Sequence, residues 1–211
     1  MGEFLTQYGA EIVQHSGEHL FLVLLSTGIA ILVGVPLGIL IVRKPHLRPF
    51  LLGFANVVQA IPSLALFGLL IPLPVLGGIG AQTAIMALIL YALLPIMRNT
   101  YLGITGVDAA VREVGRGMGM TDWQLLRRVE FPLALSVILG GIRTATVIAV
   151  GVATIAAAIG AGGLGVFIFR GVAVVDHRLI LAGAAPAALM AIAIDSALAQ
   201  LEHRLGVRQT S

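Results

Sequence analysis

The sequence predicts an all-α polytopic membrane protein with five transmembrane helices, and three observations predict this fold class. Hydrophobic residues make up 58% of the 211 residues and charged residues only 11%, whereas a soluble domain has about a quarter charged residues. The apolar runs reach the length of about 20 residues that a helix needs to cross a membrane. Prolines such as Pro36 and Pro95 lie inside these runs, which membrane bundles tolerate better than soluble helices do. The alternative, an unusually apolar soluble helical protein, is disfavoured by the length of the runs.

Five apolar segments are long enough to span a membrane, at about residues 20–42, 50–71, 79–97, 133–159 and 179–200. A sixth apolar piece, residues 164–169, is too short to span and is flanked by glycines, so we expect a loop or a re-entrant turn there. Regular repeats are not evident in the sequence. We therefore expect residues 1–211 to form a single domain.

The distribution of lysine and arginine predicts the orientation, because cytoplasmic loops of membrane proteins carry an excess of these residues. An N-terminus outside and a C-terminus inside leaves only Arg170 and Arg178 in external segments, and Arg143 inside a span. The cytoplasmic segments then hold Arg43, Lys44, Arg48, Arg98, Arg112, Arg116, Arg127, Arg128, Arg204 and Arg208. These basic residues are dispersed among loops, which argues against a nucleic-acid partner.

The longest charged segment, residues 98–132, is expected to be a cytoplasmic docking loop. Thr121 and Gln124 have the spacing of a capping box at the start of a short helix. Gly119 allows a tight bend just before that cap, and Pro132 marks the expected start of the fourth span. The pattern predicts a helix, a bend and a second helix, whereas a plain soluble connector would not need this order.

The same loop contains a recognisable motif. Its order is Glu113-Val114-Gly115, three residues, Gly119, nine residues, and Val129-Glu130-Phe131-Pro132. This resembles the EAA loop of ABC importer permeases, whose pattern is Glu-Ala-Ala, three residues, Gly, nine residues, Ile, any residue, Leu, Pro. Glu113, Gly119 and Pro132 match, and the other positions depart conservatively. The resemblance implies a type I ABC importer permease core over about residues 19–200.

Other stretches are similar to permeases for the osmoprotectant quaternary amines glycine betaine, choline and carnitine. They are residues 59–66, 94–100 and 159–165. The alternative within the importer class is a permease for amino acids, of the methionine type. A standalone carrier would be expected to have repeated halves, which five spans do not show.

The resemblance also implies the partners. Two cytoplasmic ATP-binding subunits would dock on the loops of two permease chains, identical or different, and an extracytoplasmic binding protein would deliver the substrate. The chain has no phosphate-binding Gly-rich motif, since its only lysine is Lys44, so we expect ATP hydrolysis to belong to the partner and not to this chain. The candidate coupling residues are Arg112, Glu113, Arg116, Gly119 and Pro132.

Polar residues inside the spans are candidates for the translocation path, because polarity is costly there. Asn56, Gln59 and Ser63 have the spacing i, i+3 and i+7, which places them on one face of a continuous helix. They would line a path or gate, or they would make hydrogen bonds between helices.

Arg143 lies near the middle of the fourth predicted span, where an arginine costs about 2.5–3.5 kcal/mol to insert and therefore needs a partner or water. Asp195 in the fifth span is the candidate partner for an ion pair. Direct binding of a quaternary ammonium by Arg143 is disfavoured because both groups are cationic.

No metal site or cofactor is expected. Cysteine is absent, and although His15 and His19 are four residues apart, the five histidines lack the spacing of a complete ligand set. A membrane enzyme of that kind is therefore disfavoured. An aromatic cage for a quaternary ammonium cannot be assembled either, because the one tryptophan, Trp123, lies on the charged loop.

Overall fold

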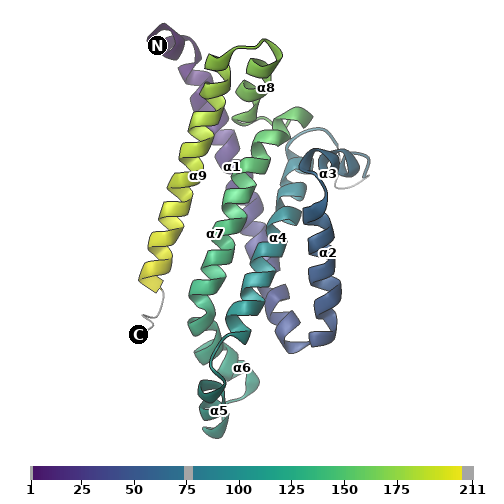
Figure 1. Ribbon diagram of the computed structural model, residues 1–211, viewed down its shortest axis with the longest axis vertical. Coiled ribbons are helices and arrows are strands. Elements are labelled where there is room, and N and C mark those ends of the chain that lie inside the picture. Colours follow the sequence, from purple (N-terminus) through teal and green to yellow (C-terminus); the bar gives the residue numbers. More distant parts are fainter. Residues whose placement is uncertain (1, 74–77, 206–211) are drawn as a thin grey trace.

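The computed structural model describes residues 2–73 and 78–205, and it confirms the all-α fold class, because helices account for nearly all of this part of the chain (Figure 1). The long helices run side by side, with the N-terminus at one end and the short helices α5 and α6 at the other (Figure 1). In chain order the elements are α1 (Gly2–Arg43), η1 (Pro45–Leu47), α2 (Arg48–Ala60), α3 (Ser63–Leu70), α4 (Ala81–Thr105), α5 (Ala109–Gly117), α6 (Asp122–Leu125), the π turn η2 (Leu126–Glu130), α7 (Phe131–Ala156), η3 (Ala157–Ile159), α8 (Gly165–Ala173) and α9 (His177–Leu205).

Within the described residues, four helical stretches are long and apolar enough to cross a membrane. They include four of the five runs expected to span, namely the first, third, fourth and fifth. A fifth crossing exists only if a sharply bent pair of helices, Pro45–Ala60 and Ser63–Leu70, counts as one span. The four long stretches are Gln7–Arg43, Ala81–Thr105, Asp122–Ile159 and His177–Arg204.

The expectation of one continuous helix over residues 50–71 is wrong, because α2 and α3 are separate helices bent by 106°. Ile61 between them is extended, with φ −71° and ψ 129°, which is the conformation that a residue before proline prefers. Pro62 has no N–H with which to continue the helix. The hydroxyl of Tyr91 on α4 donates a hydrogen bond to the carbonyl of Ile61, so the break is anchored to the bundle.

The charged loop expected over residues 98–132 is shorter than predicted, because the helices on both sides continue past their apolar runs. α4 extends to Thr105, and one helical stretch of 38 residues runs from Asp122 to Ile159. At 1.5 Å per residue this stretch is about 57 Å long, well beyond a hydrocarbon core of about 30 Å. Pro132 therefore does not begin this helical stretch, although it stands in the first turn of α7. It follows the π turn η2, which shifts the hydrogen-bond register where proline has no N–H to donate.

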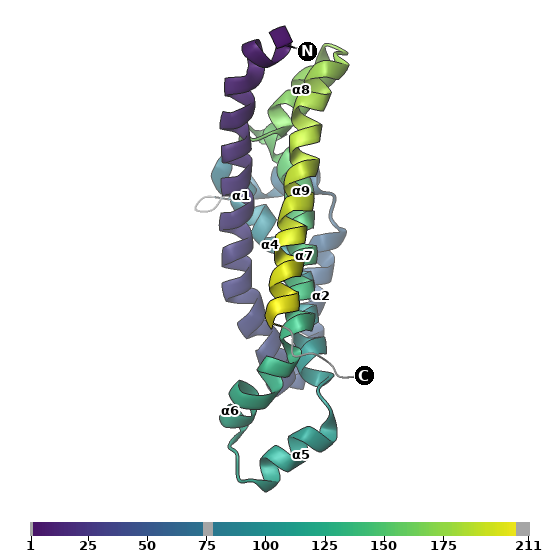
Figure 2. The ribbon, with the colours of Figure 1, turned by 90° about the vertical axis from the view of Figure 1, so that its left-hand side faces the viewer.

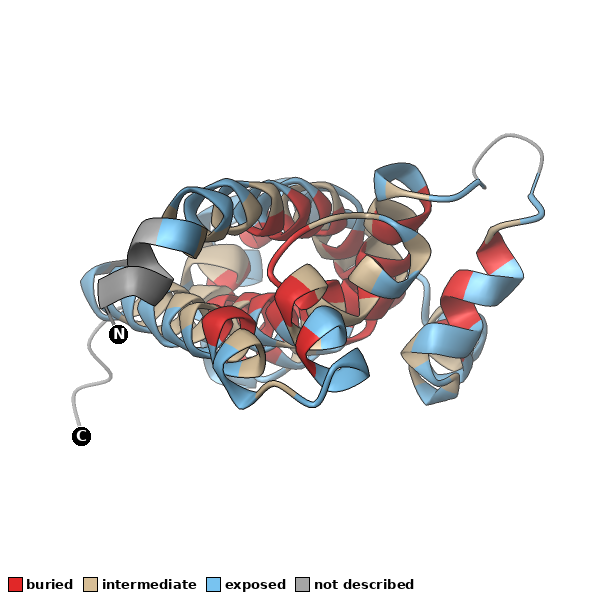
Figure 3. Ribbon diagram, turned by 90° about the horizontal axis from the view of Figure 1, so that it is seen from above, coloured by how far each residue is buried: buried red, intermediate tan, exposed pale blue. Residues whose placement is uncertain are grey.

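Close contact between α1 and α4 depends on two glycines four residues apart. A Cβ on Gly38 would lie 2.5 Å from the Cβ of Thr100, and one on Gly34 would lie 2.9 Å from Cγ2 of Ile96. Small residues at this spacing let membrane helices approach closely. Buried residues gather toward the middle of the bundle, whereas α9 is mostly exposed (Figure 3).

At the end where α1 begins, residues 164–169 belong largely to α8, a helix of nine residues, and not to the loop or turn that was expected. α8 is too short to span, and it lies beside the N-terminal part of α1 (Figure 2). Arg170 on α8 pairs with Glu11 on α1 at 3.2 Å, and the backbone N–H of Gly163 donates to the Glu18 carboxylate at 3.0 Å. These contacts join α1, at Glu11 and Glu18, to the segment before α9.

Candidate functional site

The segment that carries the loop motif projects beyond the helix bundle, at the end opposite the N-terminus (Figures 1 and 2). We name residues 106–130 the α5–η2 hairpin. Its first arm is α5 and its second arm is α6 with the π turn η2, which leads directly into α7. The predicted order of helix, bend and helix is therefore present, within narrower boundaries than expected.

The first arm presents charged side chains to solvent. The Asp108 carboxylate caps α5 by accepting a hydrogen bond of 2.8 Å from a backbone N–H of its first turn. The Arg112 guanidinium donates to the carbonyl of Thr105 at 3.4 Å, which connects α5 to the end of α4. Glu113 and Arg116 are exposed. Two of the three candidate polar contact residues are thus available to a partner.

Two glycines shape the bend between the arms. Gly119 has φ +79°, in the left-handed region that favours glycine, and the N–H of Met120 donates to the carbonyl of Gly115 at 3.2 Å. Gly115 is buried, and a Cβ there would lie 2.6 Å from Cδ1 of Leu125. The family motif has alanine at this position, and the glycine found here fits the close approach of the two arms.

The second arm begins with the capping box that the sequence predicted. The N–H of Gln124 donates to the Thr121 hydroxyl at 3.3 Å, and the Gln124 side-chain oxygen accepts from the N–H of Thr121 at 2.9 Å. Leu125 and Leu126 are buried directly after the cap. The cap and these two leucines define where the second arm starts and which side faces the bundle.

An apolar groove lies between the two arms. It has a volume of about 300 Å³. Met118, which lines the groove, is 66% exposed, and Trp123 on the second arm is 67% exposed. Large apolar side chains exposed together outside the spanning runs are typical of an interaction surface. The groove is lined by Ala110, Val111, Val114, Gly115, Met118 and Val129.

The three candidate path residues do not share one helical face, which corrects the prediction. Asn56 and Gln59 lie on α2, whereas Ser63 begins α3 beyond the break at Pro62. The i, i+7 relation assumed a continuous helix, and the 106° bend removes it. Asn56 is exposed, and none of the three side chains makes a hydrogen bond within the described residues.

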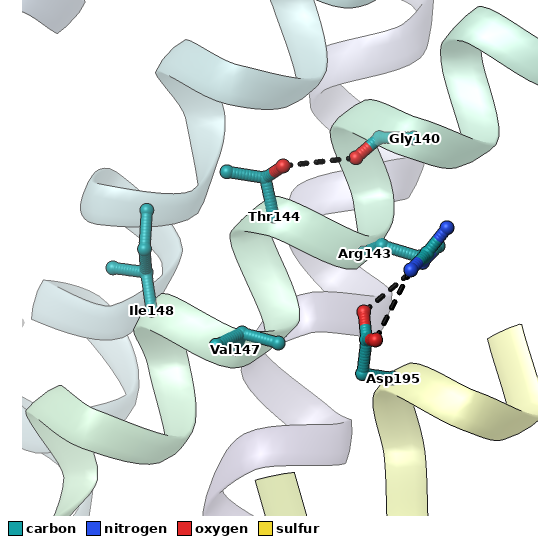
Figure 4. A pocket seen from close by; sticks show the side chains of 6 residues that line it. All are labelled: Gly140, Arg143, Thr144, Val147, Ile148 and Asp195. Atoms are coloured by element: carbon teal, nitrogen blue, oxygen red, sulfur yellow. Dashed lines mark hydrogen bonds and ion pairs between the residues drawn. The ribbon is translucent and has the colours of Figure 1, made fainter. Parts of the chain in front are cut away.

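Arg143 on α7 and Asp195 on α9 form a two-point ion pair. The guanidinium Nε and Nη2 donate to the two carboxylate oxygens of Asp195, both at 3.0 Å. Figure 4 shows the two side chains pointing toward each other across the helices. They lie at a pocket of about 440 Å³, lined by Gly140, Arg143, Thr144, Val147, Ile148 and Asp195.

A second carboxylate completes the charge cluster, and the sequence analysis missed it. Nη1 of Arg143 donates to Glu202 at 2.9 Å. Glu202 follows Asp195 by seven residues, so both carboxylates lie on one face of α9. The seven-residue spacing could have identified Glu202, but the fifth span was expected to end at residue 200, whereas α9 continues to Leu205. One arginine therefore faces two carboxylates, which leaves the cluster with a formal charge of minus one.

The two histidines considered as metal ligands have separate partners. His15 pairs with Glu18 at 2.8 Å, and the buried His19 donates from Nε2 to the carbonyl of Val150 at 3.1 Å. In the described part of the chain, no group of three or more His, Asp or Glu side chains could hold a metal ion. The α5–η2 hairpin and the Arg143 cluster remain as the candidate sites.

Three comparisons relate this geometry to known proteins. The chain matches the family described as binding-protein-dependent transport system inner membrane component over residues 30–207. It is 52% identical to an osmoprotectant import permease protein of Salmonella typhimurium, covering 90% of this chain and 87% of that one. It is 44% identical to a glycine betaine/carnitine/choline transport system permease protein of Bacillus subtilis, covering 97% and 93%. The fold is similar to the MetNI methionine ABC transporter in an inward-facing conformation, with TM-score 0.83, 24% identity and coverage of 92% and 96%.

Proposed function

This chain belongs to the family of binding-protein-dependent transport system inner membrane components, and on that premise we propose that it is the permease subunit of an ATP-driven importer for osmoprotectant quaternary amines. The family match over residues 30–207 is the observation that carries the proposal. The chain is accordingly a multi-pass protein of the bacterial inner membrane. The substrates named for the relatives indicate the class: glycine betaine, choline and carnitine.

High-affinity recognition of the substrate belongs, in this proposal, to a separate extracytoplasmic binding protein. A quaternary ammonium is held most effectively by several aromatic faces. The only tryptophan, Trp123, lies on the α5–η2 hairpin, at the end of the bundle away from the N-terminus. The permease would therefore supply a path for the substrate, with its affinity set elsewhere.

The α5–η2 hairpin is proposed as the docking element for the ATP-binding subunit. Its apolar groove and the exposed Met118 would be covered by that subunit. Glu113 and Arg116 at the edge would make polar contacts, while Arg112 holds α5 to α4. Gly119 sets the bend that presents this surface, and Pro132 follows the π turn at its base. Hydrolysis of ATP would take place on the partner.

We propose an assembly of two permease chains, identical or different, with two ATP-binding subunits. The orientation proposed for each permease has its N-terminus outside and its C-terminus inside, with the α5–η2 hairpin in the cytoplasm. Arg208, one of the residues behind this orientation, lies outside the described residues. We propose that residues 1–211 form one domain, because α1, α4 and α7 contribute side chains to both of the two larger hydrophobic clusters.

The proposed path uses polar residues of α2 and α3. Asn56 is exposed on α2, which the proposal places in the membrane; because lipid cannot satisfy an amide, its side chain should face water or the second permease chain. Gln59 and Ser63 lie on either side of the break at Pro62 and are half-buried. The ion pair between Arg143 and Asp195 is proposed to be structural, since it joins α7 to α9.

An importer for amino acids such as methionine is the second candidate, because a solved structure with a similar fold has methionine transport in its name. At 24% identity this likeness supports the fold alone. The curated relatives are more similar in sequence and name osmoprotectants, so they favour the first candidate.

Uptake into proteoliposomes tests the proposal. Vesicles would contain the permease with its ATP-binding subunit, and would receive the binding protein outside and ATP inside. We expect uptake of labelled glycine betaine, choline or carnitine that requires ATP and resists excess methionine. Uptake of methionine unaffected by the three amines would favour the amino-acid importer, and uptake independent of ATP would indicate a standalone carrier.

A further inference from the structure

An ion pair connects the end of α1 to the base of the α5–η2 hairpin. Arg43, the last residue of α1, donates from Nη2 to the Glu130 carboxylate at 2.7 Å. The same nitrogen lies 3.2 Å from the carbonyl of Asp122, the first residue of α6. One guanidinium therefore contacts both ends of the hairpin's second arm, 79 and 87 residues away along the chain.

Glu130 depends on this arginine. Its residue surface is 2% exposed, and its side chain makes no other hydrogen bond or ion pair within the described residues. A buried carboxylate without its partner is strongly unfavourable. Arg43 itself is about one-third exposed, so it lies at the boundary between the bundle and the solvent. The pair thus fixes the position of η2 relative to the end of α1.

The position of the pair suggests more than local packing. Glu130 ends the π turn η2, and single π turns within α-helices occur frequently at functional sites. Arg112 ties the first arm to α4, and the chain itself joins the second arm to α7. Arg43 adds a contact to α1, a helix that neither arm adjoins in sequence. Movement of the hairpin would therefore pull on three helices.

We propose that the pair between Arg43 and Glu130 transmits movement of the α5–η2 hairpin to α1, which makes both residues positioning residues for transport coupling. This inference rests on the proposed function, in which an ATP-binding subunit moves the hairpin. An ion pair can join two rigid elements with a defined register. Closure of the ATP-binding subunits would then tilt α1 together with α7.

The test is a double-mutant cycle in proteoliposomes containing the complete importer. The variants are Arg43→Gln, Glu130→Gln and the double variant, because glutamine removes the charge in each case and, at position 130, also keeps the shape of the side chain. Lys44→Gln is the matched control, since Lys44 is an exposed cation adjacent to Arg43 with no side-chain partner in the described residues. The measured quantity is substrate transported per ATP hydrolysed, with recovery of the ATP-binding subunit on the purified permease as a separate readout.

We expect Glu130→Gln to lower transport per ATP about fivefold, while ATP-binding subunit recovery and ATP hydrolysis remain near wild type. Arg43→Gln should show at least the same loss of transport per ATP, with lower recovery, because it leaves the Glu130 carboxylate buried without a cation. The double variant should fall no further than the single variants, because the two residues act as one unit. Lys44→Gln should behave as wild type.

Three results would overturn the inference. The first is an unchanged ratio of transport to hydrolysis in Glu130→Gln that is inserted and bound to the ATP-binding subunit. The second is a double variant whose loss equals the product of the two single losses. The third is a fall of all readouts together in Glu130→Gln, which is expected of a pair that only stabilises the fold. Failure of wild-type permease to bind any ATP-binding subunit would instead refute the proposed function.

Discussion

Gly119 offers a direct test of the bend in the α5–η2 hairpin. Its φ of +79° lies in the left-handed region, and a Cβ at this position would meet no atom within 4 Å. Substitution of alanine therefore introduces backbone strain without a steric clash. The left-handed conformation costs an alanine about 1–2 kcal/mol. The hairpin with the observed bend should therefore become roughly 5- to 30-fold less populated relative to hairpin conformations without this bend.

Two further variants are compared with Gly119→Ala. Gly117→Ala is the matched control, because Gly117 is also exposed and has open space around it, but it lies in α5 with ordinary helical φ. Gly119→Asn should lose less affinity for the ATP-binding subunit than Gly119→Ala, since asparagine tolerates the left-handed region better. The loss of affinity should therefore be largest for Gly119→Ala, smaller for Gly119→Asn and smallest for Gly117→Ala.

The assay is affinity of the purified permease for its ATP-binding subunit, combined with hydrogen exchange of the hairpin amides. Gly119→Ala should weaken binding of the ATP-binding subunit roughly 5- to 30-fold and accelerate hydrogen exchange in residues 106–130, while leaving the bundle amides protected. Equal affinities for Gly119→Ala and Gly117→Ala would refute the reasoning, because backbone strain at the bend would then have no effect on docking.

Two further predictions concern the bundle. Gly38→Val should lower the melting temperature of the purified protein in detergent, because a Cβ at this position would lie 2.5 Å from a side-chain atom of α4, and overpacking costs about 1–3 kcal/mol; an unchanged melting temperature would contradict this contact. Arg143→Gln should reduce the amount of protein in the membrane more than Asp195→Asn does, because the first leaves two carboxylates without a cation, whereas the second leaves the arginine paired with Glu202; immunoblotting of membranes would decide the order.

The fold class and most of the spans could be predicted because they depend on one simple quantity, the length of apolar runs. The break at Pro62 was missed for the same reason, since residues on both sides of it are apolar and hydropathy does not register a bend. Proline alone does not identify a break, because Pro36 and Pro95 lie inside continuous helices. What distinguishes Pro62 is the extended Ile61 and its contact with Tyr91, which depends on tertiary structure.

Within the candidate site, local features were predictable and long-range ones were not. The capping box at Thr121 depends on residues three apart, and the structure confirms it. Charged residues beyond the apolar runs remain helical, so several helices extend past their expected ends, and Glu202 was missed as a result. The contact of Arg43 with Glu130 joins residues 87 apart, and no local pattern indicates it.

In the proposed importer, the α5–η2 hairpin is the cytoplasmic surface that receives the ATP-binding subunit. Because the chain has no cysteine, a single introduced cysteine can be labelled specifically. Met118 is exposed on the hairpin, so Met118→Cys is the test variant, and Val172→Cys, at an exposed position of α8 at the opposite end, is the control. A membrane-impermeant thiol reagent should label Met118→Cys only from the cytoplasmic side, and the bound ATP-binding subunit should protect it, whereas Val172→Cys should be labelled only from outside and without protection. Labelling of Met118→Cys from outside, or equal labelling with and without the ATP-binding subunit, would contradict the account.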